Sequence, residues 1–190
     1  RPKKKSKSNK FWNYLWYFGI IYGISQYGLA KQINVSNYEA EEFLNSYFTR
    51  FPEIKLYMDQ TIKFCRKSGY VNNIFGRRSH FLNINDKNYN VRNFQERAAI
   101  NAPIQGSASE IMRLAMIKIE KKLSDQKSLK SKMLLQIHDE LIFEVKKNEV
   151  DKMKKIIKDE MVSVAHSDYH SFSIPLTVDI NSGENWGSLH

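Results

Sequence analysis

Residues 134–145 read Leu-Leu-Gln-Ile-His-Asp-Glu-Leu-Ile-Phe-Glu-Val, so apolar side chains lie on both sides of the triplet His138-Asp139-Glu140. Two apolar runs around a short polar segment are typical of a β-hairpin whose tight turn carries the polar residues. We expect this turn to hold Asp139 and Glu140 outside a buried hairpin, because an unpaired buried charge is unstable. For the triplet alone, a solvated turn is the simpler interpretation, and a metal site is the alternative.

The composition favours a partner rich in negative charge. The chain has 190 residues, of which 42% are hydrophobic, so it can bury one core, with or without a helical annex. Its net charge of +10 indicates nucleic acid before membrane, because no stretch approaches the ~18 consecutive apolar residues of a spanning helix. The single cysteine, Cys65, excludes a disulfide framework and a cysteine-based zinc site, and we interpret it as an inert buried thiol. The basic start lacks the plain apolar run of a signal peptide.

Local signals before residue 91 predict mainly helices. Residues 18–30 are glycine-rich and predict a helix that ends at the glycines, followed by a short loop. Ser36 and Glu39 form a capping box that begins a second helix, which Pro52 breaks. The remaining segments are an amphipathic helix over residues 53–67 that stops at Ser68-Gly69, a short hairpin with a basic tip over residues 70–78, and a polar loop over residues 83–90. We expect a domain boundary in that polar loop.

A long helical pattern follows over residues 91–122 and is interrupted at Pro103. Within it Arg97, Asn101 and Gln105 are spaced by four, so they share one face of a helix. By spacing alone, a solvated polar face is the simpler interpretation. Beyond the hairpin, the pattern predicts an amphipathic helix over residues 148–164 and a final strand over residues 174–180.

Five motifs occur along the chain in order. They are Phe-Gly-Ile-Ile-Tyr-Gly from Phe18, Gly-Arg-Arg from Gly76, Glu-Arg-Ala-Ala-Ile-Asn-Ala-Pro-Ile-Gln-Gly from Glu96, Ile-His-Asp-Glu-Leu from Ile137 and Gly-Glu-Asn-Trp from Gly183. In order and spacing the set resembles the C-terminal part of A-family DNA polymerases of the bacterial DNA polymerase I type. The resemblance implies an α+β fold, with a helical portion of the fingers over residues 1–88. It implies a partial palm, an antiparallel sheet with flanking helices, over residues 89–190.

The resemblance gives the central triplet a role in catalysis. Nucleotidyl transfer uses two Mg²⁺ ions about 4 Å apart, and carboxylates hold both ions. By resemblance, Asp139 is a metal-holding catalytic aspartate, and Glu140 is a catalytic residue that tunes the site. His138 resembles the residue that contacts the phosphate of the primer terminus.

Further candidates by resemblance bind DNA and nucleotide. Arg97 and Gln105 resemble residues that contact the minor groove, where donors can test base-pair geometry without reading sequence. Asn101, which lies between them on the same face, is a further DNA-binding candidate. Arg77 in the basic tip is a further DNA-binding candidate. The nucleotide-binding candidates are Phe18 and Tyr22, whose rings can accept any base, together with Lys10.

The chain departs from the family at two places. The family pairs the aspartate of the His-Asp-Glu turn with a second one in an upstream Asp-Tyr-Ser strand, and these residues do not include that strand. The segment Ser167-Asp168-Tyr169 has these three residue types in a different order and at a different place in the chain, so we interpret it as an ordinary loop. With one metal-holding aspartate missing, we expect the chain alone not to polymerise DNA.

The second departure lies in the nucleotide-binding helix, where Tyr14 and Tyr17 stand in place of the family's lysine and asparagine. When codons for residues 7–17 are read one base out of frame, they can encode Lys-Ala-Ile-Asn-Phe-Gly-Ile-Ile-Tyr-Gly. That is the missing motif, which recurs in frame from Phe18. Our hypothesis is a tandem duplication whose length is not a multiple of three, in a gene remnant or through a sequencing error. Residues 1–17 would then be translated out of frame.

Two classes of function remain. The first is a C-terminal fragment of a template-directed DNA polymerase of replication or repair, with primer-template DNA and deoxynucleoside triphosphates as partners. The alternative is a non-catalytic, DNA-binding remnant of a degraded polymerase gene. In both classes we expect a monomer without a membrane partner, located in the cytoplasm with the nucleoid or in an organelle.

Overall fold

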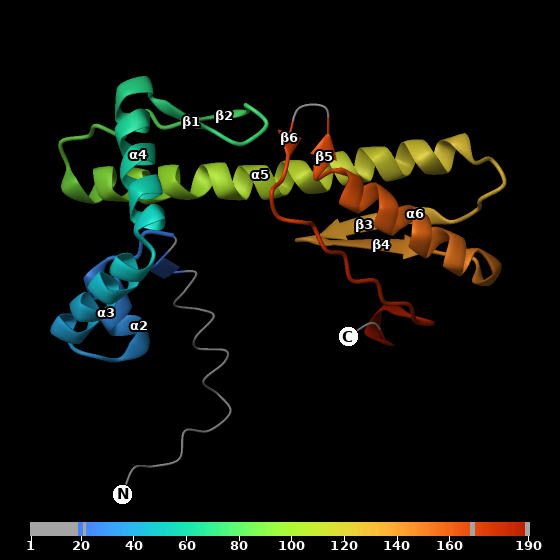
Figure 1. Ribbon diagram of the computed structural model, residues 1–190, viewed down its shortest axis with the longest axis horizontal. Coiled ribbons are helices and arrows are strands. Elements are labelled where there is room, and N and C mark those ends of the chain that lie inside the picture. Colours follow the sequence, from blue (N-terminus) through green and yellow to red (C-terminus); the bar gives the residue numbers. More distant parts are fainter. Residues whose placement is uncertain (1–18, 21, 168–169, 189–190) are drawn as a thin grey trace, which may run out of the picture. The chain divides into compact units, whose positions relative to one another are not determined.

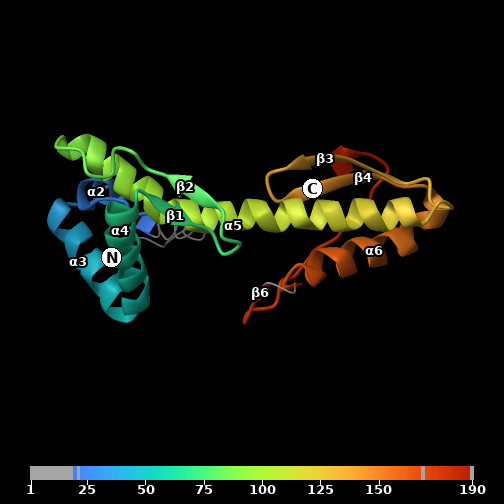
Figure 2. The same cartoon turned by 90° about the horizontal axis from the view of Figure 1, so that it is seen from above.

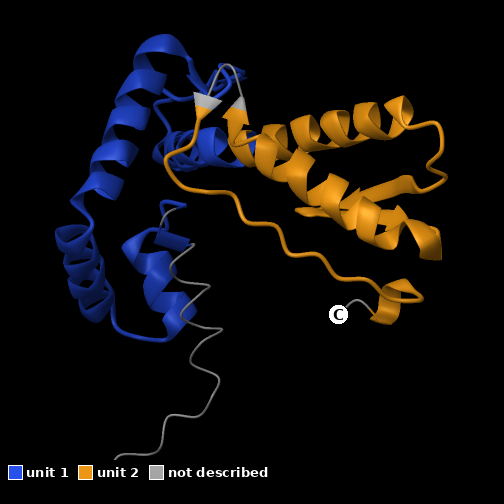
Figure 3. Ribbon diagram, turned by 45° about the vertical axis from the view of Figure 1, so that its right-hand side comes forward, with its two compact units in different colours: residues 1–106 blue, residues 107–190 orange. Residues whose placement is uncertain are grey.

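The structure is a computed structural model that describes residues 19–20, 22–167 and 170–188 (Figure 1). The chain divides into two compact units, Arg1–Gly106 and Ser107–His190 (Figure 3). The predicted boundary between fingers and palm after residue 88 is a separate division and stays a prediction. Phe18, Lys10 and the segment assigned to the out-of-frame hypothesis lie outside the described residues.

The first unit begins with three helices whose ends follow local capping rules. They are α2 (Gln26–Ile33), α3 (Asn37–Arg50) and α4 (Pro52–Ser68). The predicted capping box is confirmed, because the Ser36 hydroxyl accepts from the Glu39 N–H at 3.2 Å and the Glu39 carboxylate accepts from the Ser36 N–H at 2.9 Å. Gly69 ends α4 in the left-handed region at φ +77°, where glycine carries no steric penalty.

The sequence prediction missed α2. Gly28 indicated a loop, yet the Ser25 hydroxyl accepts from the Gly28 N–H at 3.1 Å and caps a helix that includes this glycine. Leu29 and Ala30 are buried and pack against Ala40 of α3. Tertiary burial therefore outweighs the weak helix propensity of one glycine.

A small hairpin and a long helix complete this part of the chain. Strands β1 (Tyr70–Asn72) and β2 (Arg78–His80) pair antiparallel, as the sequence predicted for this region. A core cluster of Cys65, Val71, Ile84 and Ala99 joins α4, the hairpin and the start of α5. Burial raises the pKa of the Cys65 thiol, which agrees with the prediction of an inert thiol.

Helix α5 (Tyr89–Asp125) continues through Pro103, so the predicted interruption is wrong. Proline lacks an N–H and crowds the preceding turn, which weakens but does not end a helix that is held on other sides. Here the Tyr57 hydroxyl of α4 donates to the Ile100 carbonyl at 2.9 Å. This bond supports the turn before Pro103, and the buried Ala99 and Ile100 anchor the same turn.

The second unit packs a hairpin and a helix on the second part of α5. The hairpin consists of β3 (Lys132–Ile137) and β4 (Glu140–Glu144), and it leads through η1 (Lys147–Glu149) into α6 (Val150–Ser163). In the view of Figure 2, α6 runs along one side of α5 and the hairpin along the other. Ile119, Met153 and Ile157 form the buried core, against which Leu141 and Phe143 pack.

The hairpin is less buried than the sequence predicted. Its side chains Leu141, Ile142 and Phe143 are half-buried, whereas Leu134 and Leu135 of β3 are exposed. Only one face of a strand can meet a single helical layer, because successive side chains point to opposite faces. The apolar pattern on both strands therefore predicted more burial of the hairpin side chains than the second unit provides.

The predicted strand over residues 174–180 is absent from the described residues, which instead follow an irregular path there. Pro175 lacks a ladder donor, and Ile180 packs on the core cluster of the second unit without a neighbouring strand. Two further short strands are β5 (His166–Ser167) and β6 (His170–Ser171). Ser167 of the segment interpreted as a loop therefore lies in a strand, and Asp168 and Tyr169 are not described. A last turn, η2 (Trp186–Ser188), follows.

The α+β fold class is confirmed, since long helices accompany small antiparallel sheets. Among the described residues, no helix is both long and apolar enough to cross a membrane.

Candidate functional site

The candidate residues form two groups, one in each unit. In the second unit, the β3–β4 turn is a two-residue loop, His138-Asp139, closed by the pair of Ile137 and Glu140. The predicted tight turn is therefore confirmed, with Glu140 as the first residue of β4. Within this loop His138 has φ +51°. Histidine tolerates this left-handed region better than most residues, and a positive φ matches the twist of hairpin strands.

The loop presents its polar side chains to solvent. His138, Asp139 and Glu140 are all exposed, and the Gln136 side-chain amide donates to the His138 carbonyl at 3.0 Å. This bond stabilises the turn from the strand below it. The strands thus hold two neighbouring carboxylates outside the hairpin, as expected from the sequence.

The two carboxylates make only part of a cation site. A Mg²⁺ ion takes six oxygen ligands in a nearly octahedral arrangement. Within the described residues, no three His, Cys, Asp or Glu side chains gather in a way that could hold a metal ion. Asp139 and Glu140 have the right donor chemistry, and water, phosphate or other protein groups would have to complete the set.

In the first unit, α5 carries the predicted stripe of Arg97, Asn101 and Gln105, and the turn at Tyr22-Gly23 lies against it. The Gln105 side-chain amide donates to the Tyr22 hydroxyl at 2.7 Å. A Cβ built on Gly23 would lie 3.2 Å from Cγ of Arg97, so the turn approaches the helix closely. The structure therefore brings the nucleotide-binding candidate Tyr22 beside the DNA-binding candidates.

The middle residue of the stripe is unusual in its hydrogen bonding. The side-chain oxygen of Asn101 is buried and has no hydrogen-bond partner among the described residues. A buried acceptor without a partner costs about 1–3 kcal/mol. Arg97 is half-buried and Gln105 is exposed, so the stripe is only partly solvated. The simpler interpretation of a wholly solvated face does not describe it.

A residue that the sequence prediction missed shapes the basic tip between β1 and β2. Asn73 is 8% exposed, and its side-chain oxygen accepts from the N–H groups of Phe75 at 3.0 Å and Arg77 at 2.9 Å. Its amide donates to the Gly106 carbonyl of α5 at 3.2 Å. Asn73 thus fixes the tip that presents the exposed Arg77. The signal in the sequence was an asparagine before a glycine turn, which is typical of side chains that bond their own backbone.

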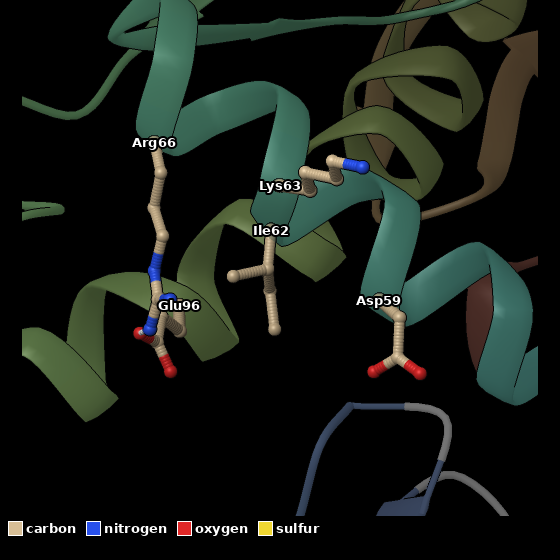
Figure 4. Close-up of a pocket in the computed structure, with 5 residues that line it drawn as sticks. All are labelled: Asp59, Ile62, Lys63, Arg66 and Glu96. Carbon is tan, nitrogen blue, oxygen red and sulfur yellow. Dashed lines mark hydrogen bonds and ion pairs between the residues drawn. The ribbon is translucent and has the colours of Figure 1, made fainter.

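The pocket drawn in Figure 4 lies between α4 and α5, away from the residues predicted from the sequence. Its lining residues are Asp59, Ile62, Lys63, Arg66 and Glu96. Arg66 and Glu96 form an ion pair, and the charges of the two acidic and two basic side chains in the pocket sum to zero. A pocket with no net charge and one apolar side chain has little to attract a phosphate-bearing ligand.

The chain resembles proteins of one family over most of its length. Residues 12–188 match the family described as DNA polymerase family A. DNA polymerase I of Caldicellulosiruptor bescii is 47% identical over 169 residues, which are 89% of this chain and 19% of that protein. DNA polymerase I of Streptococcus pneumoniae is 44% identical over the same shares. The chain thus spans about a fifth of the length of these curated relatives.

A solved structure is similar as well. It is described as the POL domain of Pol1 from M. smegmatis in complex with DNA primer-template and dNTP. The TM-score is 0.90 at 34% sequence identity, and the match covers 97% of this chain and 31% of that chain. The similarity extends through both units, which agrees with the order of motifs along the sequence.

Proposed function

The chain belongs to DNA polymerase family A, and from that membership we propose that it is the fingers-and-palm portion of a template-directed DNA polymerase. In this proposal residues 1–88 belong to the fingers and residues 89–190 to the palm. The activity belongs to a longer polypeptide, because the chain spans 19% of relatives that are named DNA polymerase I. The single observation that carries the proposal is the two-residue hairpin loop that presents Asp139 beside Glu140.

We assign Asp139 as a metal-holding residue and Glu140 as a neighbour that tunes the site. Two Mg²⁺ ions, when bound, supply the charge that activates the primer hydroxyl and neutralises the leaving group. Asp139 offers the carboxylate for this, and the exposed loop leaves it accessible. His138 lies next to it and can donate from its ring to the phosphate of the primer terminus.

We assign the stripe on α5 to the minor groove of the primer-template duplex. Arg97 and Gln105 carry donors, and the minor groove offers similar acceptors in every base pair. Asn101 belongs to the same stripe, and we assign it to DNA binding with its two neighbours there. Arg77 in the basic tip then contacts the backbone, and Tyr22 provides a ring for the nucleotide. Phe18 and Lys10 complete the nucleotide-binding candidates.

We propose further that the 190 residues alone do not extend a primer. The described part of the chain contains two exposed carboxylates at the turn and no larger ligand group. Two ions need more protein ligands than this turn offers. Inactivity of the isolated chain and activity of the longer polypeptide are therefore both expected.

The deciding experiment measures single-turnover nucleotide addition against Mg²⁺ concentration in the full-length protein that carries this segment. Asp139→Asn should nearly abolish extension while primer-template binding stays, because the amide keeps the shape and removes the charge. Glu140→Gln should cost less. Asp159→Asn on α6 is the matched control, since it neutralises an exposed carboxylate remote in sequence from the turn.

If the triplet is only a solvated turn, Asp139→Asn and Glu140→Gln should both be silent, since such surface changes fall within about 0.5 kcal/mol. Extension at the parental rate by Asp139→Asn would remove the polymerase role of this turn.

A non-catalytic DNA-binding remnant is the second candidate, favoured by the net charge of +10 together with the incomplete ligand set. Primer extension by the chain, with and without an Asp-Tyr-Ser segment joined upstream, separates the two candidates. Activity that appears with the added segment supports the polymerase fragment, whereas DNA binding without extension in both proteins supports the remnant. For either function we propose a monomer that works on DNA in the cytoplasm or an organelle.

A further inference from the structure

A buried carboxylate closes the open end of the β3–β4 hairpin, the end away from the turn. Glu149 is 9% exposed and Ser131 is 7% exposed. The Glu149 carboxylate accepts from the N–H groups of Lys130 at 3.1 Å and Ser131 at 3.0 Å, and from the Ser131 hydroxyl at 2.5 Å. The Ser131 hydroxyl oxygen accepts from the Lys146 N–H at 3.3 Å. We name this set of bonds the Glu149 clasp.

The clasp joins the residues that flank the last pair of the hairpin. That pair is Lys132 of β3 with Glu144 of β4. Lys130 and Ser131 precede β3, so their N–H groups lie outside the ladder. Glu149 supplies the acceptor that a neighbouring strand would otherwise provide, since buried backbone donors need a partner.

An ionised carboxylate suits this position better than an amide. Three donors converge on it, and a carboxylate has acceptor sites on both oxygens and no donor of its own. A glutamine would bring an NH₂ group against at least one of these donors. Hydrogen bonds from Ser131 and Lys130, with the nearby charge of Lys146, hold the pKa of Glu149 below its usual value.

Between the clasp and the turn, the ladder contains one irregularity. The register shifts between Met133 and Leu135, so Leu134 has no partner on β4. A bulge of this kind leaves the extra residue unpaired and disrupts the ladder locally. A slip of one residue would turn the side chains of that part of the strand to the other face. The turn fixes β3 at Ile137, and the clasp fixes it at Ser131.

We infer that Glu149 is a positioning residue for the His138-Asp139-Glu140 turn. Glu149 acts on the turn through Ser131 and the register of β3. Glu149 does not touch the turn itself. Held at both ends, β3 has one register, and Asp139 has one position relative to the core of the second unit. This inference rests on the proposed function of the turn and adds a residue that neither the motifs nor the exposed loop includes.

The test uses the full-length protein that carries this segment. Single-turnover extension is measured against Mg²⁺ concentration for Glu149→Gln, with Asp159→Asn as the control that removes an exposed carboxylate from α6, the helix that follows Glu149. We expect Glu149→Gln to raise the Mg²⁺ concentration for half-maximal rate, or lower the maximal rate, by about tenfold to a hundredfold. The affinity for primer-template should stay the same. A merely structural role would reduce the folded fraction without moving the Mg²⁺ dependence of the molecules that remain folded.

Ser131 provides the second variant in case Glu149→Gln fails to fold. Ser131→Ala keeps the carboxylate and the backbone donors but removes the hydroxyl that bonds both Glu149 and Lys146. Ser131→Thr restores a hydroxyl at the same place. We expect a shifted Mg²⁺ dependence for Ser131→Ala and recovery toward the parental profile for Ser131→Thr.

Asp139→Asn in the same series separates the two possible failures. If Asp139→Asn is inactive while Glu149→Gln and Ser131→Ala both keep the parental Mg²⁺ profile, the positioning role is overturned and the proposed function stands. If Asp139→Asn extends primers at the parental rate, the proposed function is overturned, and the positioning role falls with it.

Discussion

Gln105 on α5 donates a hydrogen bond to the hydroxyl of Tyr22, across 83 positions of sequence, at 2.7 Å. This bond joins the first described turn of the chain to the polar stripe of a helix in the same unit. It links a nucleotide-binding candidate with a DNA-binding candidate before any ligand is present. Its contribution to folding can therefore be measured without DNA.

Tyr22→Phe and Gln105→Ala should be coupled in a double-mutant cycle on the free energy of unfolding. We expect a coupling energy of about 0.5–1.5 kcal/mol, toward the lower end because Gln105 is exposed. Denaturant unfolding of the four proteins measures it. The control cycle pairs Gln105→Ala with Tyr27→Phe, where Tyr27 is 70% exposed, and should give no coupling. Equal coupling energies in both cycles would contradict a specific contribution of the Gln105–Tyr22 hydrogen bond to the free energy of unfolding.

Gly23→Ala should destabilise the chain more than Gly69→Ala. Both glycines have positive φ, at +70° and +77°, so both substitutions carry the cost of about 1–2 kcal/mol for a Cβ in this region. Only at Gly23 does the new Cβ also meet a neighbour, Cγ of Arg97, whereas nothing lies within 4 Å at Gly69. We expect a difference of about 1 kcal/mol in unfolding free energy. Equal losses would show that Arg97 moves aside freely.

The chain should bind primer-template DNA weakly, without sequence preference and with strong salt dependence, because phosphate contacts release counterions. Arg97→Ala should weaken binding equally for all sequences, because the minor-groove acceptors are similar in every base pair. Titrations by fluorescence anisotropy at several salt concentrations measure both effects. Lys155→Ala is a control of equal charge change, since Lys155 pairs with Asp159. Base-specific protection in a footprint would contradict the minor-groove assignment.

Glu149 should make the stability of the chain depend on pH. Because its pKa is lowered in the folded state, its contribution is complete above the ordinary glutamate value of about 4.3 and is lost as pH falls through the folded-state pKa. The difference in unfolding free energy between the parent and Glu149→Gln should therefore be largest near neutrality and shrink in acid. Urea unfolding from neutral pH into acid measures this difference. A constant difference over that range would contradict an ionised clasp.

The nucleotide sequence that encodes residues 7–25 tests the duplication hypothesis. We expect a direct repeat whose length is not divisible by three, with the Lys-to-Gly motif in the shifted frame before Phe18. Resequencing of the locus distinguishes a true gene remnant from a sequencing error. Codons for residues 7–17 that differ from this repeat would contradict the hypothesis.

Local rules predicted the elements whose ends depend on neighbouring residues. The Ser36–Glu39 box, the stop at Gly69 and the turn at His138-Asp139 all require only a few consecutive side chains. Elements that depend on distant packing were missed or misplaced. Helix α2 includes Gly28 because Leu29 is buried by α3, and residues 174–180 form no strand because no described strand lies beside them.

The candidate site divides in the same way. Resemblance proposed Asp139 and the stripe on α5 as candidates, and the stripe does lie within one helix. Neither could identify Asn73 or Glu149, because their roles come from bonds to Gly106 and Ser131, which are distant in sequence. A polar side chain that serves the backbone of another segment leaves no periodic signal.

Cys65, buried in the core of the first unit and unique in the sequence, provides a reporter that needs no engineering. A thiol reagent can reach its sulfur only when that unit opens, and the raised pKa further slows reaction in the closed state. The rate of labelling therefore measures the opening of the first unit alone. The same reagent, applied with and without DNA, would show how far a duplex bound along α5 holds that unit closed.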